Sequence, residues 1–594
     1  MPKMETTANR KEKGHALPAL KQTHNIALSS NKRLYILYVA LCLVSTGGTF
    51  VSLAAIQYSS SGAYRILFEQ TELTEVCIGV ALFSTAAVVF RLVRMAQNSV
   101  SNRLSLDMKR YFEHAVNDKL SSIRWDYYET HEANRDIFTV RTKSLQAVMR
   151  LLQSMISYLT AVPYIVIYSY YLFQINVPAV VAYVVLLVAL NRIVGKRLNS
   201  LWKLWDEAQG YMRREGYFMG LAGDKDTHQE YRQNRLFGYI SQKWSELFDR
   251  EYKVSMEIHW RYEVRLQTAR FILNLPYILM MLLTAYEIAI GKHEIGFLLL
   301  ANRLFNNIVD TYMSVQNAAM VNQTESKYLE LFAEVMSYET AEAVPERYKE
   351  TDIEARDVSF VYPQSQRKAL GHLTVSIKYG EKIAIVGANG SGKTTFCNLL
   401  MGLTDRYDGL IAYGEDALDL GRSIACIMQD FAQYEMTVRE NIEMGDVDRS
   451  FTDDEIVGLL EKVGLKGYVM SLAQGIDTPL GQLDKGIELS KGQWQRLAIA
   501  RLLANPKATV WVLDEPTAYL DPMSEIGFYD LIYQLSGSRT VIFISHRLGF
   551  ARRADRILVF EDGRIAEEGT HEELLGQNGI YADMYASQTE WYTH

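Results

Sequence analysis

The chain has 594 residues, which is too long for one hydrophobic core and predicts several domain-sized units. Its net charge of −7 at pH 7 argues against a generally basic surface, so no nucleic-acid partner is expected. The four cysteines are scattered and form no C-x-x-C pair, so neither a disulfide framework nor a zinc site is expected.

The N-terminal segment, residues 1–30, is polar and basic and lacks the pattern of a cleavable signal peptide. It leads directly into Leu34–Ile56, an apolar run that exceeds the roughly 20 helical residues needed to cross a bilayer core. Because basic flanks stay on the cytoplasmic side, we expect residues 1–30 to be a cytoplasmic tail.

Five further apolar runs follow the first. Their residues are Val76–Val93, Leu151–Phe173, Ala179–Val194, Phe271–Ile290 and Phe297–Val321. For any single run, a buried helical hairpin in a soluble protein is the alternative, but six runs in paired order argue against it. We therefore expect an all-α domain of six transmembrane helices over residues 31–335, in the cell membrane and in contact with the lipid bilayer.

Two connections between these runs, Met95–Arg150 and Gly195–Arg270, are long, charged and apolar at helical spacing. This pattern predicts spanning helices that continue far into the cytoplasm. Each connection has a local interruption, at Trp125–Asp136 and at Gly223–Asn234. Short segments at the tips of such extensions are placed to press against a cytoplasmic domain, and solvated surface turns are the alternative.

The last apolar run carries a polar stripe. A charge that faces lipid is costly, so the stripe should face the bundle interior or a watery cavity. One interpretation is a substrate path; the other is a buried Arg–Asp pair that fixes packing. The residues of this possible substrate cavity are Asn302, Arg303, Asn306, Asn307 and Asp310.

The pattern changes after residue 335. Residues 336–350 include a charged, proline-containing stretch and are expected to be a linker. Residues 351–594 alternate short β-rich runs with helical patterns, which predicts an α/β domain with a largely parallel sheet. The expected strands are Val358–Val361, Leu373–Ile377, Ile383–Val386, Thr509–Leu513, Thr540–Ile544 and Ile557–Phe560.

A phosphate-binding loop follows the third of these strands. The segment Lys382–Thr395, KIAIVGANGSGKTT, fits G-x-x-x-x-G-K-[ST] between a strand and a helix. Its glycines let backbone N–H groups form an anion-binding nest at a helix N-terminus. Lys393 is expected to reach the β- and γ-phosphates of a nucleotide, and Thr394 to hold Mg²⁺. The expected ATP-binding residues here are Gly387, Asn389, Gly390, Ser391, Gly392, Lys393, Thr394 and Thr395.

Two adjacent carboxylates follow the apolar run 509–513. Strand ends in parallel sheets point at the ligand crevice, so Asp514 is placed to hold Mg²⁺ and Glu515 to deprotonate the attacking water. A single carboxylate there would also fit a helix cap. Two in succession, in a chain that carries a phosphate loop, are much more specific.

The run LSKGQ at Leu489–Gln493, followed by a helical pattern, is a third motif beside the phosphate-binding loop and the paired carboxylates. With it, the chain resembles an ATP-binding cassette (ABC) half-transporter of the exporter type from about residue 30 onward. The resemblance implies that Tyr362 stacks on adenine, that Gln429 touches Mg²⁺, and that His546 contacts the γ-phosphate. It further implies ATP contacts at Asp521 and, from the opposite copy, at Ser490, Gly492 and Gln493.

The same resemblance implies two nucleotide domains paired head to tail, and hence a second copy of the chain or a relative. A homodimer is favoured over a heterodimer because all hydrolytic residues are present in this chain. Two positions depart from the family pattern, Lys491 for the usual glycine and Tyr519 for a small residue. Lys491 is compatible with stronger ATP binding, slower product release, or a side chain that points to solvent.

The closest resemblance is to exporters of ribosomally made peptides, including lantibiotics and other bacteriocins. It rests on LSKGQWQRLAIARLL and on ETHEANRDIF after Tyr128. The residues before Leu34 hold no cysteine and are too few for a peptidase domain, so leader cleavage by this chain is not expected. A lipid, lipid-linked or multidrug exporter is the alternative; an exporter-shaped importer or a non-transporting cassette ATPase is less favoured.

Overall fold

The structure is a computed structural model in which the chain divides into two compact units. One unit combines Met1–Asp118 with Ile137–Met336, and the other combines Lys119–Asp136 with Ser337–His594. The structure describes residues 16–69, 74–175, 185, 201–293, 296–341, 351–363, 365–404, 406–413, 416–417, 423–483, 485–517, 522–545, 548–549 and 551–593.

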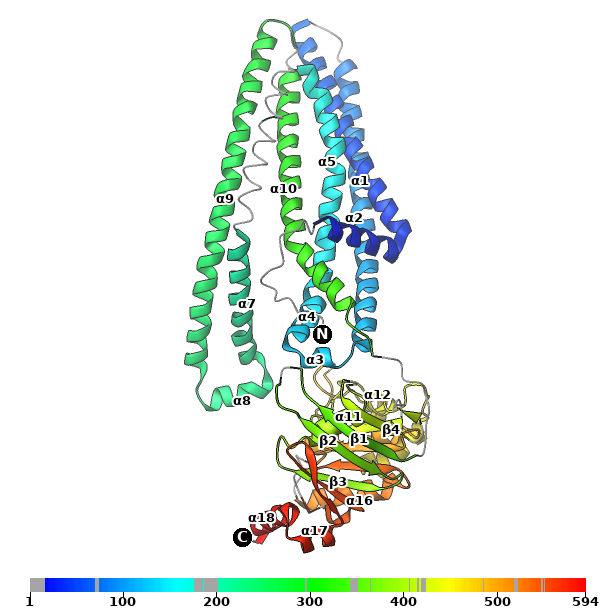
Figure 1. Cartoon of the computed structure of the whole chain (residues 1–594). Helices are drawn as coiled ribbons and strands as arrows, with labels where there is room; N and C mark the ends of the chain where they lie inside the picture. The colour runs from blue at the N-terminus through cyan, green and yellow to red at the C-terminus, as the bar shows by residue number, and fades with distance from the viewer. Residues whose placement is uncertain are drawn as a thin grey trace. The chain divides into compact units, whose positions relative to one another are not determined.

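The described residues of the first unit form helices joined by short turns (Figure 1). Helix α10 packs against α1 and α5, and α7 packs against α9. The elements are α1 (Ala16–Glu69), α2 (Thr74–Ser122), α4 (His131–Thr139), a π-helical turn η2 (Val140–Ser144), α5 (Leu145–Ile175), α7 (Leu201–Gly223), α8 (Lys225–Gln233), α9 (Phe237–Ala289) and α10 (Gly296–Met336). The all-α prediction for this part of the chain is therefore confirmed.

Helix α1 consists of two helices joined at Asn31, whose backbone is extended (φ −160°, ψ 90°). The Asn31 side chain accepts a hydrogen bond from the Leu34 N–H at 3.1 Å, which is N-cap geometry for the second helix. The same side chain donates to Asp107 Oδ2 at 2.8 Å. The sequence reading of residues 1–30 as a polar tail did not include a helix, yet Ala16–Ser30 are helical and bury Ala19 and Ile26.

Three described helical stretches are long and apolar enough to cross a membrane: Pro18–Ile56, Cys77–Ser122 and His131–Tyr171. The first contains the predicted span Leu34–Ile56, and the other two overlap the predicted spans Val76–Val93 and Leu151–Phe173 without containing them fully. Helix α9 adds a shorter apolar stretch, Tyr277–Ala289, and α10 contains the sixth predicted span. The fourth, Ala179–Val194, lies outside the described residues except for residue 185, so the count of six remains a prediction.

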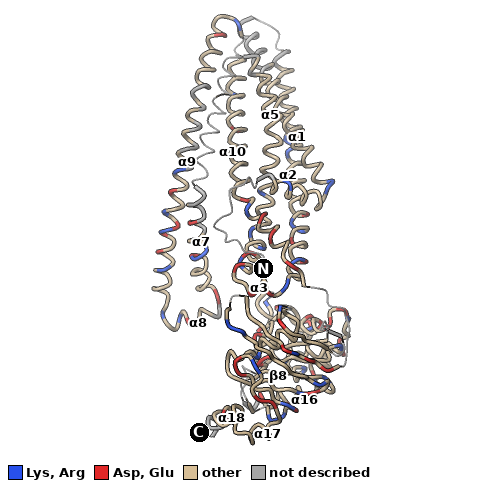
Figure 2. The backbone as a smooth tube through the Cα atoms, in the orientation of Figure 1, with Lys and Arg blue, Asp and Glu red and all other residues tan. Residues whose placement is uncertain are grey.

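Charged residues gather at one end of the α7–α8–α9 arm (Figure 2). In α9 the charges lie in the half nearest α8, whereas the other half is almost free of them in the figure. This division is typical of a spanning helix that continues beyond the membrane, since a charged side chain in the hydrocarbon region is costly. The interruption predicted at Gly223–Asn234 coincides with the short helix α8.

The second unit holds two sheets. A six-stranded sheet has the order β10–β9–β3–β8–β7–β6, parallel except for β10, and a four-stranded antiparallel sheet has the order β2–β1–β4–β5. The strands are β1 (Ile353–Phe360), β2 (Leu370–Ile377), β3 (Lys382–Gly387), β4 (Asp408–Tyr413), β5 (Asp416–Ala417), β6 (Ile424–Ile427), β7 (Val510–Asp514), β8 (Thr540–Ile544), β9 (Arg556–Glu561) and β10 (Arg564–Gly569). The predicted α/β domain is thus confirmed.

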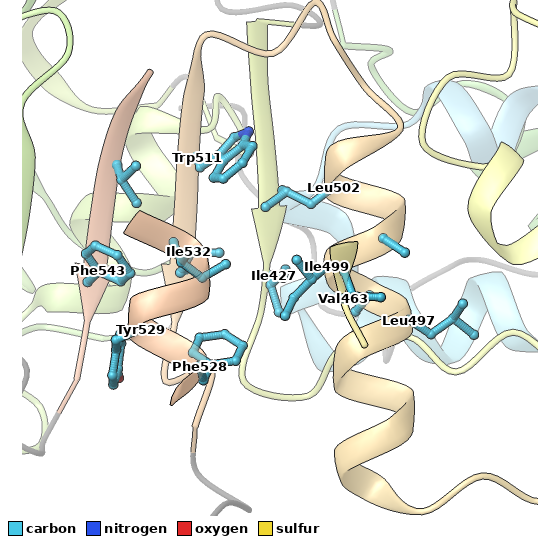
Figure 3. Packing of buried hydrophobic residues seen from close by; sticks show 14 of the residues in the cluster. Ile427, Val463, Leu497, Ile499, Leu502, Trp511, Phe528, Tyr529, Ile532 and Phe543 are labelled. Carbon is cyan, nitrogen blue, oxygen red and sulfur yellow. The ribbon is translucent and has the colours of Figure 1, made fainter. Parts of the chain in front are cut away.

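Helices surround these sheets. They are α3 (Asp126–Glu129), α11 (Lys393–Leu400), α12 (Val438–Glu443), α13 (Asp453–Lys462), α14 (Lys466–Met470), η4 (Gly475–Asp477), α15 (Lys491–Leu503), α16 (Pro522–Ser536), η5 (Ala551–Arg553), α17 (His571–Gln577) and α18 (Ile580–Thr593). Side chains of α15 and α16 pack with those of β7 and β8 (Figure 3). Trp511 of β7 is 0% exposed, so its truncation to alanine should cost about 3–5 kcal/mol of stability.

The predicted interruption at Trp125–Asp136 contacts the α/β domain, as expected. Asp126, 7% exposed, accepts a hydrogen bond from Thr404 Oγ1 at 2.6 Å, beyond the C-terminal end of α11. Arg124 and Arg406 both lie beside its other oxygen, at 3.0 and 3.3 Å. The same two arginines reach the Glu339 carboxylate, at 3.3 and 3.0 Å. We call these five residues the Asp126 network.

Candidate functional site

The phosphate-binding loop lies where β3 ends and α11 begins. Its backbone is left-handed at Gly387 (φ 149°), Gly390 (φ 78°) and Gly392 (φ 105°). A Cβ atom on Gly387 would lie 2.3 Å from the Phe560 carbonyl oxygen, and one on Gly392 would lie 2.7 Å from that of Ala369. Glycine is therefore required at both positions, because a side chain has neither the space nor the backbone conformation.

Lys393 opens helix α11 and is 5% exposed. Its Nζ donates hydrogen bonds to the carbonyl oxygens of Gly387 at 2.9 Å and Ala388 at 2.8 Å. Burial lowers the pKa of this ammonium, whereas the charges of Glu515 and Asp514 act to raise it. The lysine therefore lies inside the concave face of the loop, with partners that a phosphate can replace.

Asp514 and Glu515 lie at the adjacent end of β7. Asp514 is 3% exposed, and burial raises the pKa of its carboxyl although Thr394 hydrogen-bonds to it. Glu515 has a left-handed backbone (φ 44°), unusual for a residue with a side chain, and its N–H donates to the Ile544 carbonyl oxygen at 2.9 Å. Backbone strain of this kind concentrates at functional sites.

The donor set fits a magnesium ion. Among the described residues, Asp514 Oδ1 is buried and has no hydrogen-bond partner, and Thr394 lies beside the same carboxyl group. Gln429 is exposed just beyond the end of β6, which pairs with β7. The part of the chain that the structure describes contains no group of three or more His, Cys, Asp or Glu side chains that could hold a metal ion. One carboxylate, one hydroxyl and substrate phosphates are the usual donors for Mg²⁺ in such sites.

Tyr362 lies near the same loop. Its ring packs edge-on against Phe360 at the end of β1, with centroids 4.9 Å apart. Its hydroxyl is 3.1 Å from Thr395 Oγ1 in the first turn of α11. The side chain is half-buried, so part of the ring remains accessible to a flat ligand such as a nucleobase.

The LSKGQ motif forms the N-terminus of α15. Ser490 is the N-cap, and it forms reciprocal hydrogen bonds with Gln493: Oγ accepts from the Gln493 N–H at 3.3 Å, and the Ser490 N–H donates to Oε1 at 2.9 Å. Ser490 and Lys491 are exposed and Gly492 is half-buried. Leu489 and Trp494, 5% and 2% exposed, anchor the motif. The positive end of a helix of thirteen residues thus faces outward.

Three residues singled out in the sequence, Asp521, His546 and Tyr519, lie outside the described residues. The residue before the histidine, Ser545, is buried at the end of β8, where its N–H donates to the Ile385 carbonyl oxygen at 3.4 Å. Strands β3, β7 and β8 are parallel, with Ile385 and Asp514 both paired to Ile544. Their carboxyl ends therefore meet at one edge of the sheet.

The helical unit contains a separate cavity of about 620 Å³. Of the polar stripe predicted on α10, the residues Arg303, Asn307 and Asp310 line it, whereas Asn302 and Asn306 do not. The latter pair lies on the neighbouring face, where Asn306 Nδ2 donates to Asn302 Oδ1 at 3.2 Å and Tyr277 Oη donates to the same oxygen at 3.0 Å.

The sequence reading missed the other walls of this cavity. Helix α1 contributes Ser45, Thr49 and Ser52, which repeat at helical spacing in an apolar run, and that repeat was a usable signal. Arg94 comes from α2. The further lining residues are Gly48, Leu53, Ile56, Phe83, Phe90, Ser157, Thr160, Ala161, Tyr164, Tyr168, Thr311 and Ser314.

Comparison with known proteins agrees with this arrangement. Residues 370–518 match the family model described as ABC transporter. The nisin transport ATP-binding protein NisT of Lactococcus lactis subsp. lactis is 27% identical over 593 residues, 97% of each chain. The subtilin transport ATP-binding protein SpaT of Bacillus subtilis is 40% identical over 240 residues, 39% of each chain.

A solved structure resembles the whole fold. A bacterial Atm1-family ABC exporter with ATP bound superposes with a TM-score of 0.75 at 21% identity, covering 94% of this chain and 98% of that one. Together with the loop, the paired carboxylates and the exposed LSKGQ helix, these likenesses agree on one assignment. The chain is an ABC half-transporter of the exporter type, an ATP hydrolase coupled to transport, with a helical membrane domain and an ATP-binding domain.

Proposed function

We propose that this ABC half-transporter exports a ribosomally made peptide across the cytoplasmic membrane. The observation that carries the proposal is the likeness to NisT over 97% of both chains. That likeness includes the helical domain through which cargo must pass. The likeness to SpaT adds less, because it covers only 39% of the chain.

The ATP site has a role for each residue of the loop. The backbone N–H groups from Gly387 to Lys393 and the Lys393 ammonium bind the phosphates, and Tyr362 stacks on the adenine. Burial of Lys393 strengthens its attraction to phosphate, because the surroundings screen the charge weakly. The remaining proposed ATP contacts within this copy are Asn389, Gly390, Ser391, Gly392, Thr394, Thr395 and Asp521.

Hydrolysis needs a base, a metal and a γ-phosphate contact. We assign the general base to Glu515, whose left-handed backbone fixes the direction in which its side chain leaves the main chain. Gln429 and His546 are the further proposed catalytic residues. Thr394, Asp514 and Gln429 would hold Mg²⁺, which when bound neutralises charge on the β- and γ-phosphate oxygens. The unpartnered Asp514 oxygen supports this placement.

A second copy of the chain completes the site. Ser490, Gly492 and Gln493 of the other copy would cap the γ-phosphate held by Lys393, because the exposed N-terminus of α15 attracts anions. ATP then joins the two copies and hydrolysis separates them. The membrane helices respond by alternating between inward and outward openings, a two-state change biased by ligand.

We infer that the ATP-binding domain and the N-terminus lie in the cytoplasm. Lys21, Lys32 and Arg33 flank the first apolar run, and basic residues are retained on that side of a membrane. Residues 31–335 then form the membrane domain, 336–350 the linker and 351–594 the nucleotide-binding domain.

Reconstitution in lipid bilayers tests the cargo. Amphipathic peptides should stimulate Mg²⁺-dependent ATP hydrolysis by the purified full chain above its basal rate, and the Glu515→Gln variant should show no stimulated turnover. Stimulation by lipid-linked or drug-like amphiphiles, with no response to any peptide in a varied set, would replace peptide export by the alternative cargo class.

A further inference from the structure

The cavity in the helical unit carries charge that the fold does not neutralise. Arg94 from α2 and Arg303 and Asp310 from α10 line it. Among the residues that the structure describes, no ion pair or hydrogen bond joins any of these three side chains to a neighbour. Two guanidinium groups and one carboxylate leave a net charge of +1, and a guanidinium stays protonated at any physiological pH.

These charges are accessible and costly where they lie. Arg94, Arg303 and Asp310 are all exposed in the structure, so a ligand in the cavity can touch them. Arg303 and Asp310 lie within the predicted span Phe297–Val321, where an ionisable residue is rare and marks a functional position, and Arg94 lies one residue beyond the predicted span Val76–Val93. The alternative of a buried Arg303–Asp310 pair does not hold, because both side chains are exposed and no ion pair joins these two described residues.

Hydroxyl groups line the same cavity as the charges. They belong to Ser45, Thr49 and Ser52 of α1 and to Ser157 and Thr160 of α5. Serine and threonine hydroxyls both donate and accept hydrogen bonds, which suits a peptide backbone with its alternating N–H and C=O groups. The volume of about 620 Å³ is within the range of roughly 300–1,000 Å³ for ligand pockets.

This polarity is local to the cavity. A second groove of about 510 Å³ lies between α1 and α2, and of its lining residues only Thr85 and Tyr58 carry a polar side-chain atom. Phe90 lines both spaces. The same two helices therefore help to line both an apolar groove and a cavity that contains arginine and hydroxyl side chains. The polar character belongs to the cavity and not to the helices as a whole.

We infer that the cavity binds a carboxylate of the transported peptide, through Arg94 and Arg303. This inference rests on the proposed export of a peptide and adds a chemical requirement to it: the cargo carries an acidic side chain or a free C-terminus. A planar guanidinium forms two parallel hydrogen bonds with a carboxylate, and such charge-assisted bonds are about twice as strong as neutral ones. Asp310 weakens the site for anions and keeps it from holding them too tightly.

The test measures peptide binding rather than transport. The full chain in nanodiscs of neutral lipid, without nucleotide, is titrated with a fluorescent amphipathic peptide that contains glutamate and with its twin that has glutamine instead. The glutamate peptide should bind at least about tenfold more tightly, the factor expected of one retained charge-assisted contact worth about 1.4 kcal/mol.

Variants locate the effect. Arg303→Gln and Arg94→Gln should each reduce the difference between the two peptides, and Asp310→Asn should increase it. Arg303→Lys should retain only part of it, because lysine keeps the charge but not the two parallel hydrogen bonds. Arg91→Gln is the matched control, because Arg91 lies one turn from Arg94 on α2, is exposed, and does not line the cavity. The thermal unfolding midpoint of each variant shows that it has folded.

The outcomes separate the two claims. Equal affinity for both peptides, or equal loss in Arg91→Gln and Arg303→Gln, would overturn the carboxylate site while leaving peptide export intact. If neither peptide binds but a phosphate-bearing lipid stimulates ATP hydrolysis in an Arg303-dependent manner, the anion-binding cavity stands and the peptide as its source is overturned.

Discussion

Substituting Asp126 by asparagine tests how the segment Lys119–Asp136 is attached to the ATP-binding domain. The change keeps the side-chain shape but removes the charge that Arg124 and Arg406 both face. Breaking a buried charge pair costs about 3–5 kcal/mol. The side chain of Arg406 is 55% exposed and therefore partly screened by water, so we expect a smaller loss of about 2 kcal/mol.

Hydrogen exchange measures this loss directly. The Arg124 N–H donates to the Glu339 carbonyl oxygen at 3.3 Å, and the Ala341 N–H donates to that of Ser122 at 2.7 Å, so both amides report on attachment of the two segments. A loss of about 2 kcal/mol corresponds to exchange about 30-fold faster at these positions. We expect peptide-stimulated ATP hydrolysis to fall in the same variant, because the proposed transport cycle requires the membrane helices to respond to the ATP site.

The matched control is Glu132→Gln. This residue lies in the same segment, but among the described residues its one ion-pair partner is Arg135 at 4.0 Å, with both side chains more than half exposed. Exposed pairs of this kind contribute about 0–1 kcal/mol. Unchanged exchange at Arg124 and Ala341 in Asp126→Asn, or an equal acceleration in Glu132→Gln, would refute the reasoning.

Three further substitutions concern the ATP site. Glu515→Gln should abolish steady-state ATP hydrolysis while nucleotide binding is retained, and near wild-type turnover would remove Glu515 as the general base. Gly387→Ala should lower thermal stability and ATP binding far more than Gly390→Ala, since only the first Cβ meets backbone, at 2.3 Å from Phe560 O; similar midpoints for both would contradict the close approach. Asp514→Asn should raise the unfolding midpoint of nucleotide-free protein at neutral pH, because burial raises the pKa of this carboxyl and the ionised form opposes folding. That gain should shrink as pH falls through the raised pKa and vanish near the ordinary value of about 4, and a gain that persists there would exclude the charge as its cause.

The ATP-binding domain was largely predictable, because its signals are local. The run Ile383–Val386 lies within β3, and the G-x-x-x-x-G-K-T spacing fixes the loop and the start of α11 at Lys393. Strands buried on both faces read as continuous apolar runs, as in β7 and β8. Strand β10, RIAEEG, escaped prediction because its charged residues lie on an exposed antiparallel edge.

The helical unit was less predictable, because its important contacts join distant residues. The stripe on α10 was visible as a pattern, but only packing against α1 and α5 decides that Asp310 lines the cavity and Asn306 does not. The helix before Asn31 was hidden in a basic composition, although Ala19, Thr23, Ile26 and Ala27 repeat at helical spacing and are buried. The Asp126 network joins residues that are far apart in the sequence. Asp126 and Thr404 are separated by 278 positions, and no local pattern indicates such a contact.

The most direct test of the account is peptide uptake by membrane vesicles that expose the ATP-binding domain to the medium. With Mg²⁺ and ATP outside, wild-type vesicles should accumulate a labelled, glutamate-containing amphipathic peptide against its concentration gradient, and Glu515→Gln vesicles should not. Equal accumulation by the two, or none by wild-type vesicles that hydrolyse ATP, would contradict the claim that this ATPase drives peptide export.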